Sequence, residues 1–322
     1  MPEYRVGRQG PEVGGMRLAL LIVTLAAILF PVPAIAQAPD PWFVEGDAAC
    51  RRVALVFNIG IGETPSETVL NTLVEKGVAA TMFPMGSFAR SHPDYLRRLN
   101  DAGFEIGTHG DTNLWLTDAS NMEIRADALA SVDAIEAVIG REIDPWHTPF
   151  AANTDERVRA VIATTGLLPI GWRIAAPDWS AEATEEDVYN AVFGGVYPGA
   201  IVEMHLDGPA TDASTARALP RLIDDLRARD FEFVTIGEMR QPCEGTSPTV
   251  PEPVTLSGLD VHGLHCTETP AQGAKLIRIL FNGDVVTPRG PVFEGWLPVE
   301  CAGQRGWVMA ESVPGIDLVA GQ

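Results

Sequence analysis

Hydrophobic and polar positions follow two different periods along the middle of the chain. Short apolar runs, such as 53–57 and 200–204, have the length and β-branched content of buried strands. Between them lie longer segments in which apolar residues recur three and four positions apart, as expected for amphipathic helices. The first such segment starts at Ser66, a favourable N-cap residue, and stops at Gly77. The middle of the chain therefore alternates predicted strands and helices.

The full series predicts an α/β fold. Strands are expected at 53–57, 79–83, 104–108, 168–174, 200–204 and 231–235, and helices at 66–77, 94–102, 120–139, 154–164, 185–192 and 214–229. Roughly seven β/α units in this order favour a distorted (β/α)7-type parallel barrel. In such barrels the chemistry takes place at the carboxyl ends of the strands. The ends of the predicted strands are therefore where a site is expected.

The pattern changes near residue 241, which ends the expected α/β domain at 50–241. Residues 242–254 are rich in Pro, Ser and Thr and lack a periodic apolar pattern, which predicts a linker. Beyond them, short β-type runs at 275–281, 284–287, 296–299 and 306–309 are separated by Gly and Pro turns. This spacing predicts a small all-β module over 255–316.

The N-terminus has the features of a secretory signal peptide over residues 1–38. Arg17 precedes the apolar run 18–30, which is followed by Pro31, Pro33 and the small-residue pattern of 34–38. The run is shorter than the about 20 residues of a membrane helix, although an uncleaved anchor is the alternative. Met16 is an alternative start. We expect a protein exported to the periplasm or beyond, with no integral membrane association after cleavage.

The net charge limits the classes of partner, and the cysteines predict disulfide bridges. A formal charge of −20 argues against nucleic acid and anionic membrane surfaces, but leaves neutral ligands such as glycans open. Export permits disulfides. Because a closed barrel brings its first and last strands together, we predict a Cys50–Cys243 bridge. The remaining pair, Cys266–Cys301, would then lie in the all-β module. The alternative is four free buried thiols.

The predicted strand ends carry motifs of a known family. They are VALVFNIG at 53–60, AGFEIGTHGDTNLWLT at 102–117, PWHTPF at 145–150, Pro177–Trp179 and Ile201–His205. Together they resemble the NodB-type polysaccharide deacetylases (carbohydrate esterase family 4). The resemblance implies hydrolysis of N- or O-acetyl groups on glycans, using a divalent metal held by one Asp and two His. It also implies a second Asp as base and a late His as acid.

The base and metal positions of that family are largely substituted here. The base position holds Asn58 and the metal Asp position holds Ile59. The first metal histidine is kept as His109, whereas the second is Asn113. A catalytic zinc normally takes three protein ligands, and loss of a positioned base costs about 10²–10⁴ in rate. The resemblance therefore implies weakened or lost metal-dependent hydrolysis.

The acid side of the family's site is kept. The resemblance assigns the acid to His205 and the carboxylate that orients it to Asp178, whereas the arginine that would tether the base is His147. We therefore expect an impaired homologue that binds envelope glycan, such as acetylated polysaccharide or peptidoglycan, with little or no hydrolysis and no cofactor. A protein that binds another envelope protein is a further possibility.

An active metal-dependent deacetylase is the alternative. His109, His147 and His205, with Glu203 as a substitute ligand, would then form a rebuilt zinc site. Glu203 is two residues from His205 and shares its strand face. In the alternative to this site, Glu203 forms a buried ion pair with Arg173. Two further acids, Asp111 and Asp207, are then solvated loop carboxylates.

Aromatic residues near the expected mouth suit sugar binding, because aromatic faces pack on the apolar side of a pyranose. The predicted substrate-binding residues are Trp115, Trp146, Trp179 and His147. Trp172 is a fourth tryptophan near the expected mouth. The alternative for all four is core packing, which is favoured for Trp172 and Trp179. Trp115 and Trp146, in loops after strand ends, are favoured for sugar contact.

The C-terminal module resembles bacterial SH3-like domains. The resemblance lies in the turn at 282–284 and in the segments Gly295–Val299 and Gly303–Val308, each of which contains a Gly and a Trp. It implies targeting to the cell wall or periplasm, with the two cysteines as an addition to the usual pattern. A structural appendage is the alternative.

Overall fold

The computed structural model describes residues 40–60, 64–243, 252–301 and 303–316. The predicted signal peptide at 1–38 lies outside these residues, as does most of the predicted linker. Among the residues described, no helix is long and apolar enough to cross a membrane.

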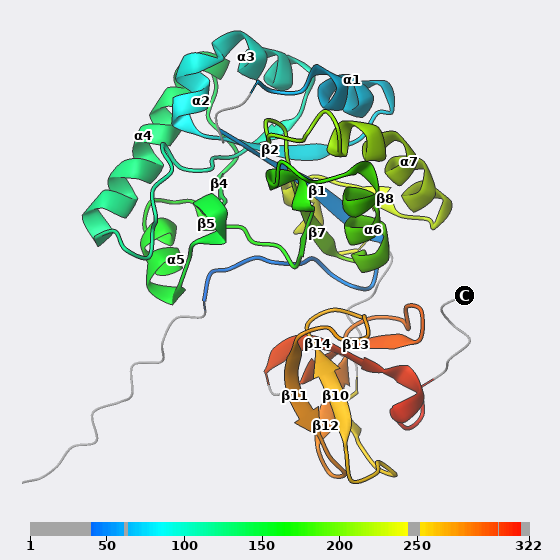
Figure 1. The fold of residues 1–322 in the computed structure, drawn as a ribbon. Coiled ribbons are helices and arrows are strands. Elements are labelled where there is room, and N and C mark those ends of the chain that lie inside the picture. The colour runs from blue at the N-terminus through cyan, green and yellow to red at the C-terminus, as the bar shows by residue number, and fades with distance from the viewer. Residues whose placement is uncertain (1–39, 61–63, 244–251, 302, 317–322) are drawn as a thin grey trace, which may run out of the picture. The chain divides into compact units, whose positions relative to one another are not determined.

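A parallel sheet forms the centre of the α/β part (Figure 1). Its middle strand, β1 (Arg52–Ile59), pairs with β2 (Ala80–Pro84) and with β7 (Ala200–His205). The order is β3-β2-β1-β7-β6, where β3 is Glu105–Ile106 and β6 is Ile174–Ala175. The apolar run 53–57 is completely buried within it. The predicted α/β fold with a parallel sheet is confirmed.

Helices surround this sheet (Figure 1). They are α1 (Glu67–Glu75), α2 (Gly86–Ser91), α3 (Pro93–Asp101), α4 (Asn121–Ile139), α5 (Glu156–Ala163), α6 (Glu185–Gly195), α7 (Thr215–Ala228) and α8 (Ile236–Met239). Helix α1 begins after Ser66, whose side chain accepts a hydrogen bond from the backbone N–H of Val69. This cap explains why the helix starts where the sequence predicted. The short helix α2 was not expected.

The sheet continues irregularly beyond β3. Strand β4 (Trp146–His147) pairs with β5 (Leu168–Pro169), and a bridge from Thr108 to His147 links β4 to the end of β3. The single strand expected at 168–174 is thus divided into β5 and β6. Two residues ahead of β1 take part as well, because Phe43 bridges to Ile170 and Glu45 to Ala200.

The first and last strands of the α/β part meet, as expected. Strand β8 (Glu232–Phe233) pairs with the start of β1, with Arg52 opposite Glu232. Cys50 and Cys243, which flank these strands, form a disulfide. The predicted bridge is confirmed, and it ties the entry of the α/β part to its exit.

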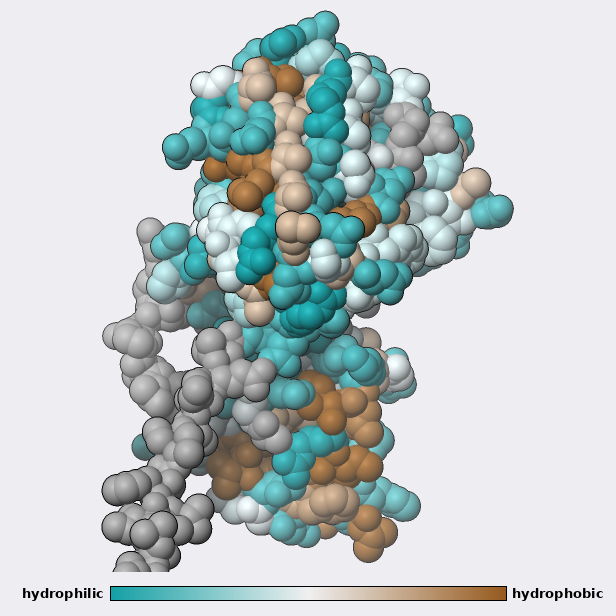
Figure 2. Space-filling model, turned by 90° about the vertical axis from the view of Figure 1, so that its left-hand side faces the viewer, coloured by the Kyte–Doolittle hydropathy of each residue, from teal (hydrophilic) through white to brown (hydrophobic). Residues whose placement is uncertain are grey.

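The C-terminal part is a separate six-stranded antiparallel sheet in the order β11-β10-β14-β13-β12-β9. Its strands are β9 (Val254–Thr255), β10 (Leu264–Thr267), β11 (Leu276–Leu280), β12 (Val285–Pro288), β13 (Trp296–Cys301) and β14 (Gln304–Met309). It has its own cluster of buried apolar residues, and this cluster includes the disulfide Cys266–Cys301. On the face shown in Figure 2, brown hydrophobic side chains gather on the C-terminal part beside teal hydrophilic ones.

Candidate functional site

A pocket of about 370 Å³ opens at the carboxyl ends of β1, β6 and β7. We call it the strand-end pocket. It is lined by Asn58, His109, Phe150, Ala151, Ala152, Trp172, Ala175, Trp179, Glu203 and His205. Asn58 ends the apolar run of β1 and lies directly opposite His205 of β7. The parallel pairing therefore brings Asn58, where the family resemblance places a base, beside His205, where it places the acid.

The side chain of Asn58 is held at both ends. Its Nδ2 donates to Glu203 Oε1 at 3.1 Å, and its Oδ1 accepts from the Thr148 hydroxyl at 2.8 Å. The reversed amide would place Oδ1 against a carboxylate, so these partners fix its orientation. An amide with no proton equilibrium near neutral pH thus occupies the position where the family resemblance places a base.

His109 has a defined tautomer. Its Nδ1 lies 2.8 Å from Thr148 Oγ1 and 3.1 Å from the Thr148 carbonyl oxygen. Because the hydroxyl hydrogen of Thr148 goes to Asn58, Nδ1 must carry the hydrogen and Nε2 a lone pair. Burial, together with His205 and His147, lowers the pKa of His109 to about 3. His109 is therefore a neutral imidazole at neutral pH.

His205 is held between two carboxylates. Its Nδ1 lies 2.9 Å from Asp178 Oδ1 and its Nε2 lies 3.1 Å from Glu203 Oε1. Asp178, which is fully buried, also accepts from the Thr215 hydroxyl at 2.6 Å. Burial alone would lower the pKa of His205, but the hydrogen bond to Asp178 and the neighbouring carboxylates raise it to about 9. The imidazole is therefore charged at neutral pH.

Glu203 belongs to this network and not to an ion pair with Arg173. The guanidinium of Arg173 instead contacts Glu45 at 3.3 Å. Burial raises the pKa of Glu203 to about 7, and Asp178 adds to the shift, whereas His205 and Asn58 oppose it. The Glu203 carboxyl thus changes its charge near neutral pH.

Two acids that the sequence left as solvated loop residues are engaged in the structure. Asp111 pairs with Arg90 at 2.8 Å. Asp207 is fully buried and accepts the backbone N–H of Gly60 at 2.9 Å. Neither acid is a lining residue of the strand-end pocket.

The residues present do not fit a three-ligand catalytic metal. Ile59 is fully buried and has no donor atom, and Asn113 is exposed and outside the pocket lining. His147 is buried on β4, also outside the lining, and burial lowers its pKa to about 4. Within the described ranges no three His, Cys, Asp or Glu side chains are grouped so as to hold a metal. Only His109 remains of the ligands that the family resemblance implies.

The tryptophans considered for sugar contact differ in their exposure and in whether they line the pocket. Trp179 is 62% exposed and lines the pocket, as does Trp172. Trp115 is exposed and packs edge-on against Phe150 at 6.1 Å, but it is not a lining residue. Trp146 is buried beneath the side chain of Arg240.

One wall of the pocket was missed by sequence reasoning. It is the short 3₁₀ turn η1 (Phe150–Ala152), in which Ala151 and Ala152 have φ values of 51° and 54°. Left-handed alanine is uncommon, and nothing in the sequence predicts it. Thr148 was missed as well, although it lies within the quoted PWHTPF motif.

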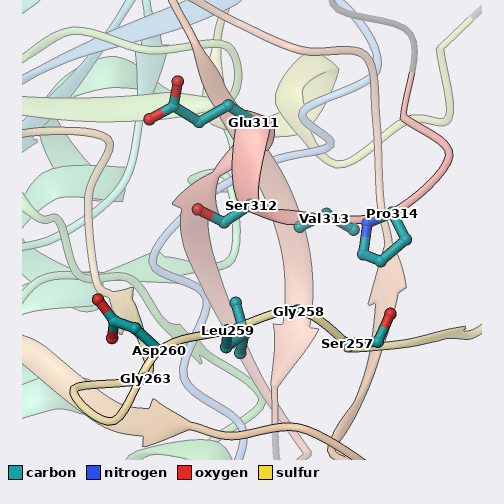
Figure 3. Close-up of a pocket in the computed structure, with 9 residues that line it drawn as sticks. All are labelled: Ser257, Gly258, Leu259, Asp260, Gly263, Glu311, Ser312, Val313 and Pro314. Atoms are coloured by element: carbon teal, nitrogen blue, oxygen red, sulfur yellow. The ribbon is translucent and has the colours of Figure 1, made fainter.

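A second cavity, of about 520 Å³, lies in the C-terminal part (Figure 3). Its lining comes from the segment Ser257–Gly263 and from Glu311–Pro314 next to the 3₁₀ turn η3 (Ala310–Ser312). Asp260 and Glu311 are its ionisable lining residues, and none of the nine is aromatic. It lacks the convergent polar network of the strand-end pocket.

Comparison with known proteins gives the family. A family model described as polysaccharide deacetylase matches residues 45–170. A chitooligosaccharide deacetylase of Bradyrhizobium sp. is 30% identical over 195 residues, covering 57% of this chain and 88% of the relative. The peptidoglycan-N-acetylglucosamine deacetylase PgdA of Listeria monocytogenes is 29% identical over 189 residues, which cover 59% of this chain and 39% of that protein.

Solved structures share the fold. The crystal structure of a Bacillus anthracis protein described as a CE4 family pseudoenzyme matches with a TM-score of 0.55 and 24% identity, covering 62% of this chain and 68% of that one. At that identity the match shows the fold alone. Together with the identity and coverage of the Bradyrhizobium relative, these findings place the chain in the polysaccharide deacetylase family.

Proposed function

We propose that this chain binds a glycan of the N-acetylglucosamine type in the strand-end pocket and hydrolyses it little or not at all. The observation that carries the proposal is Asn58. Its amide occupies the base position and is held between Thr148 and Glu203. An amide in this position has no means of taking a proton from water.

Glu203 does not replace the missing base. A hydrolytic site needs a base on the attacking water and an acid on the leaving group. Glu203 and His205 are directly paired at 3.1 Å, so the carboxylate accepts from the imidazolium of His205 and not from an attacking water. Because His109 is the one family metal ligand left, no bound metal would compensate.

Glycan binding is supported by the pocket walls and by the relatives. Phe150, Trp172 and Trp179 provide aromatic faces beside polar groups, an arrangement that suits a sugar ring. The named relatives are deacetylases of chitooligosaccharides and of peptidoglycan N-acetylglucosamine. We therefore infer an acetylated polysaccharide or peptidoglycan as partner.

The test measures acetate release and binding on the same preparation. Full-length mature protein, loaded with zinc, is incubated with chitotetraose whose four residues are N-acetylated, and binding is followed by calorimetry. We expect saturable binding to chitotetraose or to its deacetylated form, without acetate above background. Acetate release that is abolished by His205→Asn would contradict the proposal.

A restoration variant provides the positive control. Asn58→Asp, Ile59→Asp, Asn113→His and His147→Arg together return the residues that the family resemblance assigns to base, metal and tether. This variant should retain zinc after dialysis, whereas the unmodified chain should not. Zinc retention by the unmodified chain at one equivalent would favour the rebuilt metal site instead.

We further propose that the protein is exported and that residues 255–316 form an SH3-like wall-targeting module. The apolar N-terminal segment and two disulfides support export, since disulfides persist in oxidising compartments. Cell fractionation and sedimentation of the full chain with purified peptidoglycan sacculi test both points. Recovery in the cytoplasm with reduced cysteines would contradict export.

A further inference from the structure

We propose that the strand-end pocket selects a sugar residue with a free, protonated amine over its N-acetylated counterpart. This inference rests on the proposed function, in which the pocket binds a glycan. It adds the chemical form of the one residue held in the pocket: within an acetylated glycan that is partly deacetylated, this residue is an amino sugar with a free amine, such as glucosamine.

The floor of the pocket presents acceptors. We define the floor as Asn58, His109, Glu203 and His205. Glu203 uses one carboxylate oxygen, Oε1, for both Asn58 and His205, and Oε2 has no hydrogen-bond partner in the described part of the chain. His109 uses Nδ1 for Thr148, which leaves the lone pair of Nε2. Both side chains are over 90% buried and line the pocket.

His205 is the charged hydrogen-bond donor of the floor, and both of its ring nitrogens already have protein partners. His205 directs both ring nitrogens at carboxylates, Asp178 on one side and Glu203 on the other. An acetamide brings one N–H donor and a carbonyl acceptor, and for that carbonyl the floor has only the second Nδ2 hydrogen of Asn58, the first being given to Glu203. An ammonium brings three donors and no acceptor, and so matches Oε2 of Glu203 and Nε2 of His109.

The charge balance favours a cation as well. The imidazolium of His205 lies between two carboxylates, so the three groups together are negative when Glu203 is ionised. No Lys or Arg is among the ten lining residues. An ammonium ion in the pocket would balance this negative charge.

The aromatic walls of the strand-end pocket also suit an amino sugar with a protonated amine. Phe150, Trp172 and Trp179 offer aromatic faces, which attract cations as well as the apolar side of a sugar ring. The volume of 370 Å³ falls in the lower part of the range of about 300–1,000 Å³ for small-molecule sites. A single sugar residue is therefore a suitable occupant.

The experiment compares three tetrasaccharides that differ at the sugar 2-position. Calorimetry with the full mature chain at neutral pH uses tetraglucosamine (amine), N-acetylated chitotetraose (acetamide) and cellotetraose (hydroxyl). We expect tetraglucosamine to bind roughly tenfold more tightly or better, as for a hydrogen bond to a charged group. Glu203→Gln should remove this preference.

A matched control separates local from general charge effects. Glu75→Gln makes the same change of charge on an exposed residue of α1, outside the pocket, and should leave the preference intact. The comparison of the three tetrasaccharides on the unmodified chain still tests the amine preference if Glu203→Gln does not fold.

The outcomes distinguish this inference from the proposed function. Equal or tighter binding of the acetylated ligand overturns the amine preference and leaves glycan binding in place. Binding of none of the three overturns both. An amine preference that survives Glu203→Gln, or that Glu75→Gln also removes, overturns the assignment to Glu203.

Discussion

Three buried polar side chains of the site depend on one hydroxyl group. Thr148 donates to Asn58 and lies against Nδ1 of His109, and Asn58 in turn donates to Glu203. A buried polar group that loses its partner costs more than the hydrogen bond itself contributed. The orientation of the pocket floor therefore rests on Thr148.

Replacing Thr148 by Val should lower the free energy of unfolding. The valine keeps the shape and the backbone carbonyl that accepts from His109 Nδ1, but it leaves Asn58 Oδ1 without its donor, at a cost of about 1–3 kcal/mol. Urea denaturation measures this change. Thr148→Ser keeps the hydroxyl and should recover most of the loss; equal destabilisation by both variants would contradict the role of the hydroxyl.

The free energy of unfolding should also fall as the pH rises through the range in which Glu203 and His205 lose their protons. Folding raises the pKa of Glu203 from 4.5 to about 7 and that of His205 from 6.5 to about 9. Each group therefore contributes stability below its unfolded pKa that is lost as pH rises through its folded pKa. Between pH 6.5 and 9 we expect a loss of roughly 1–3 kcal/mol from His205.

Denaturation at a series of pH values measures this loss. Asp178→Asn removes the hydrogen bond that raises the pKa of His205 and should flatten the curve in this window. A curve of unchanged slope in this variant would show that His205 does not titrate as stated.

At the scale of elements, pairing and turns position the floor and the wall. Parallel pairing of β1 with β7 places Asn58 opposite His205. The turn η1 forms a wall with two consecutive alanines at positive φ. An L-residue in this region carries a steric cost that glycine avoids.

Glycine at Ala151 and Ala152 should therefore be tolerated or stabilising. Relief of the left-handed strain, about 1–2 kcal/mol per residue, offsets the greater freedom of glycine in the unfolded chain. The matched control is Ala160→Gly on the exposed face of α5, where glycine should cost about 1 kcal/mol. Thermal unfolding compares them, and an equal loss at both places would contradict the strained turn.

The sequence predicted most elements but not their details. The run 53–57 and the helix after Ser66 follow from local pattern and capping, and both are present. The expected strand at 168–174 is divided, because its first residues pair with β4 and Phe43 whereas Ile174 pairs with β7. Short pieces such as α2 and η1 have too few residues to show a period.

At the scale of the whole molecule, two disulfides close very different lengths of chain. Cys50–Cys243 spans a sequence separation of 193 residues, and Cys266–Cys301 spans 35. A crosslink limits the unfolded chain more when the closed loop is longer. The first bridge also joins the segments next to the paired strands β1 and β8.

Replacing Cys50 and Cys243 by Ala should therefore cost more stability than replacing Cys266 and Cys301. We expect a loss of about 2–5 kcal/mol for the first pair and less for the second. Denaturant unfolding monitored by tryptophan fluorescence compares the two double variants. A larger loss from the shorter loop would contradict the chain-entropy argument.

The sequence by itself determined the α/β series, the two disulfides and the substitutions at the strand ends. These depend on local period, on cysteine placement and on the identity of residues within motifs. The tertiary structure decided which polar groups meet: Glu203 meets Asn58 and His205, Arg173 meets Glu45, and His147 is not among the residues that line the pocket. Side-chain direction and hydrogen-bond partners arise from strand pairing between distant segments, which a linear pattern does not contain.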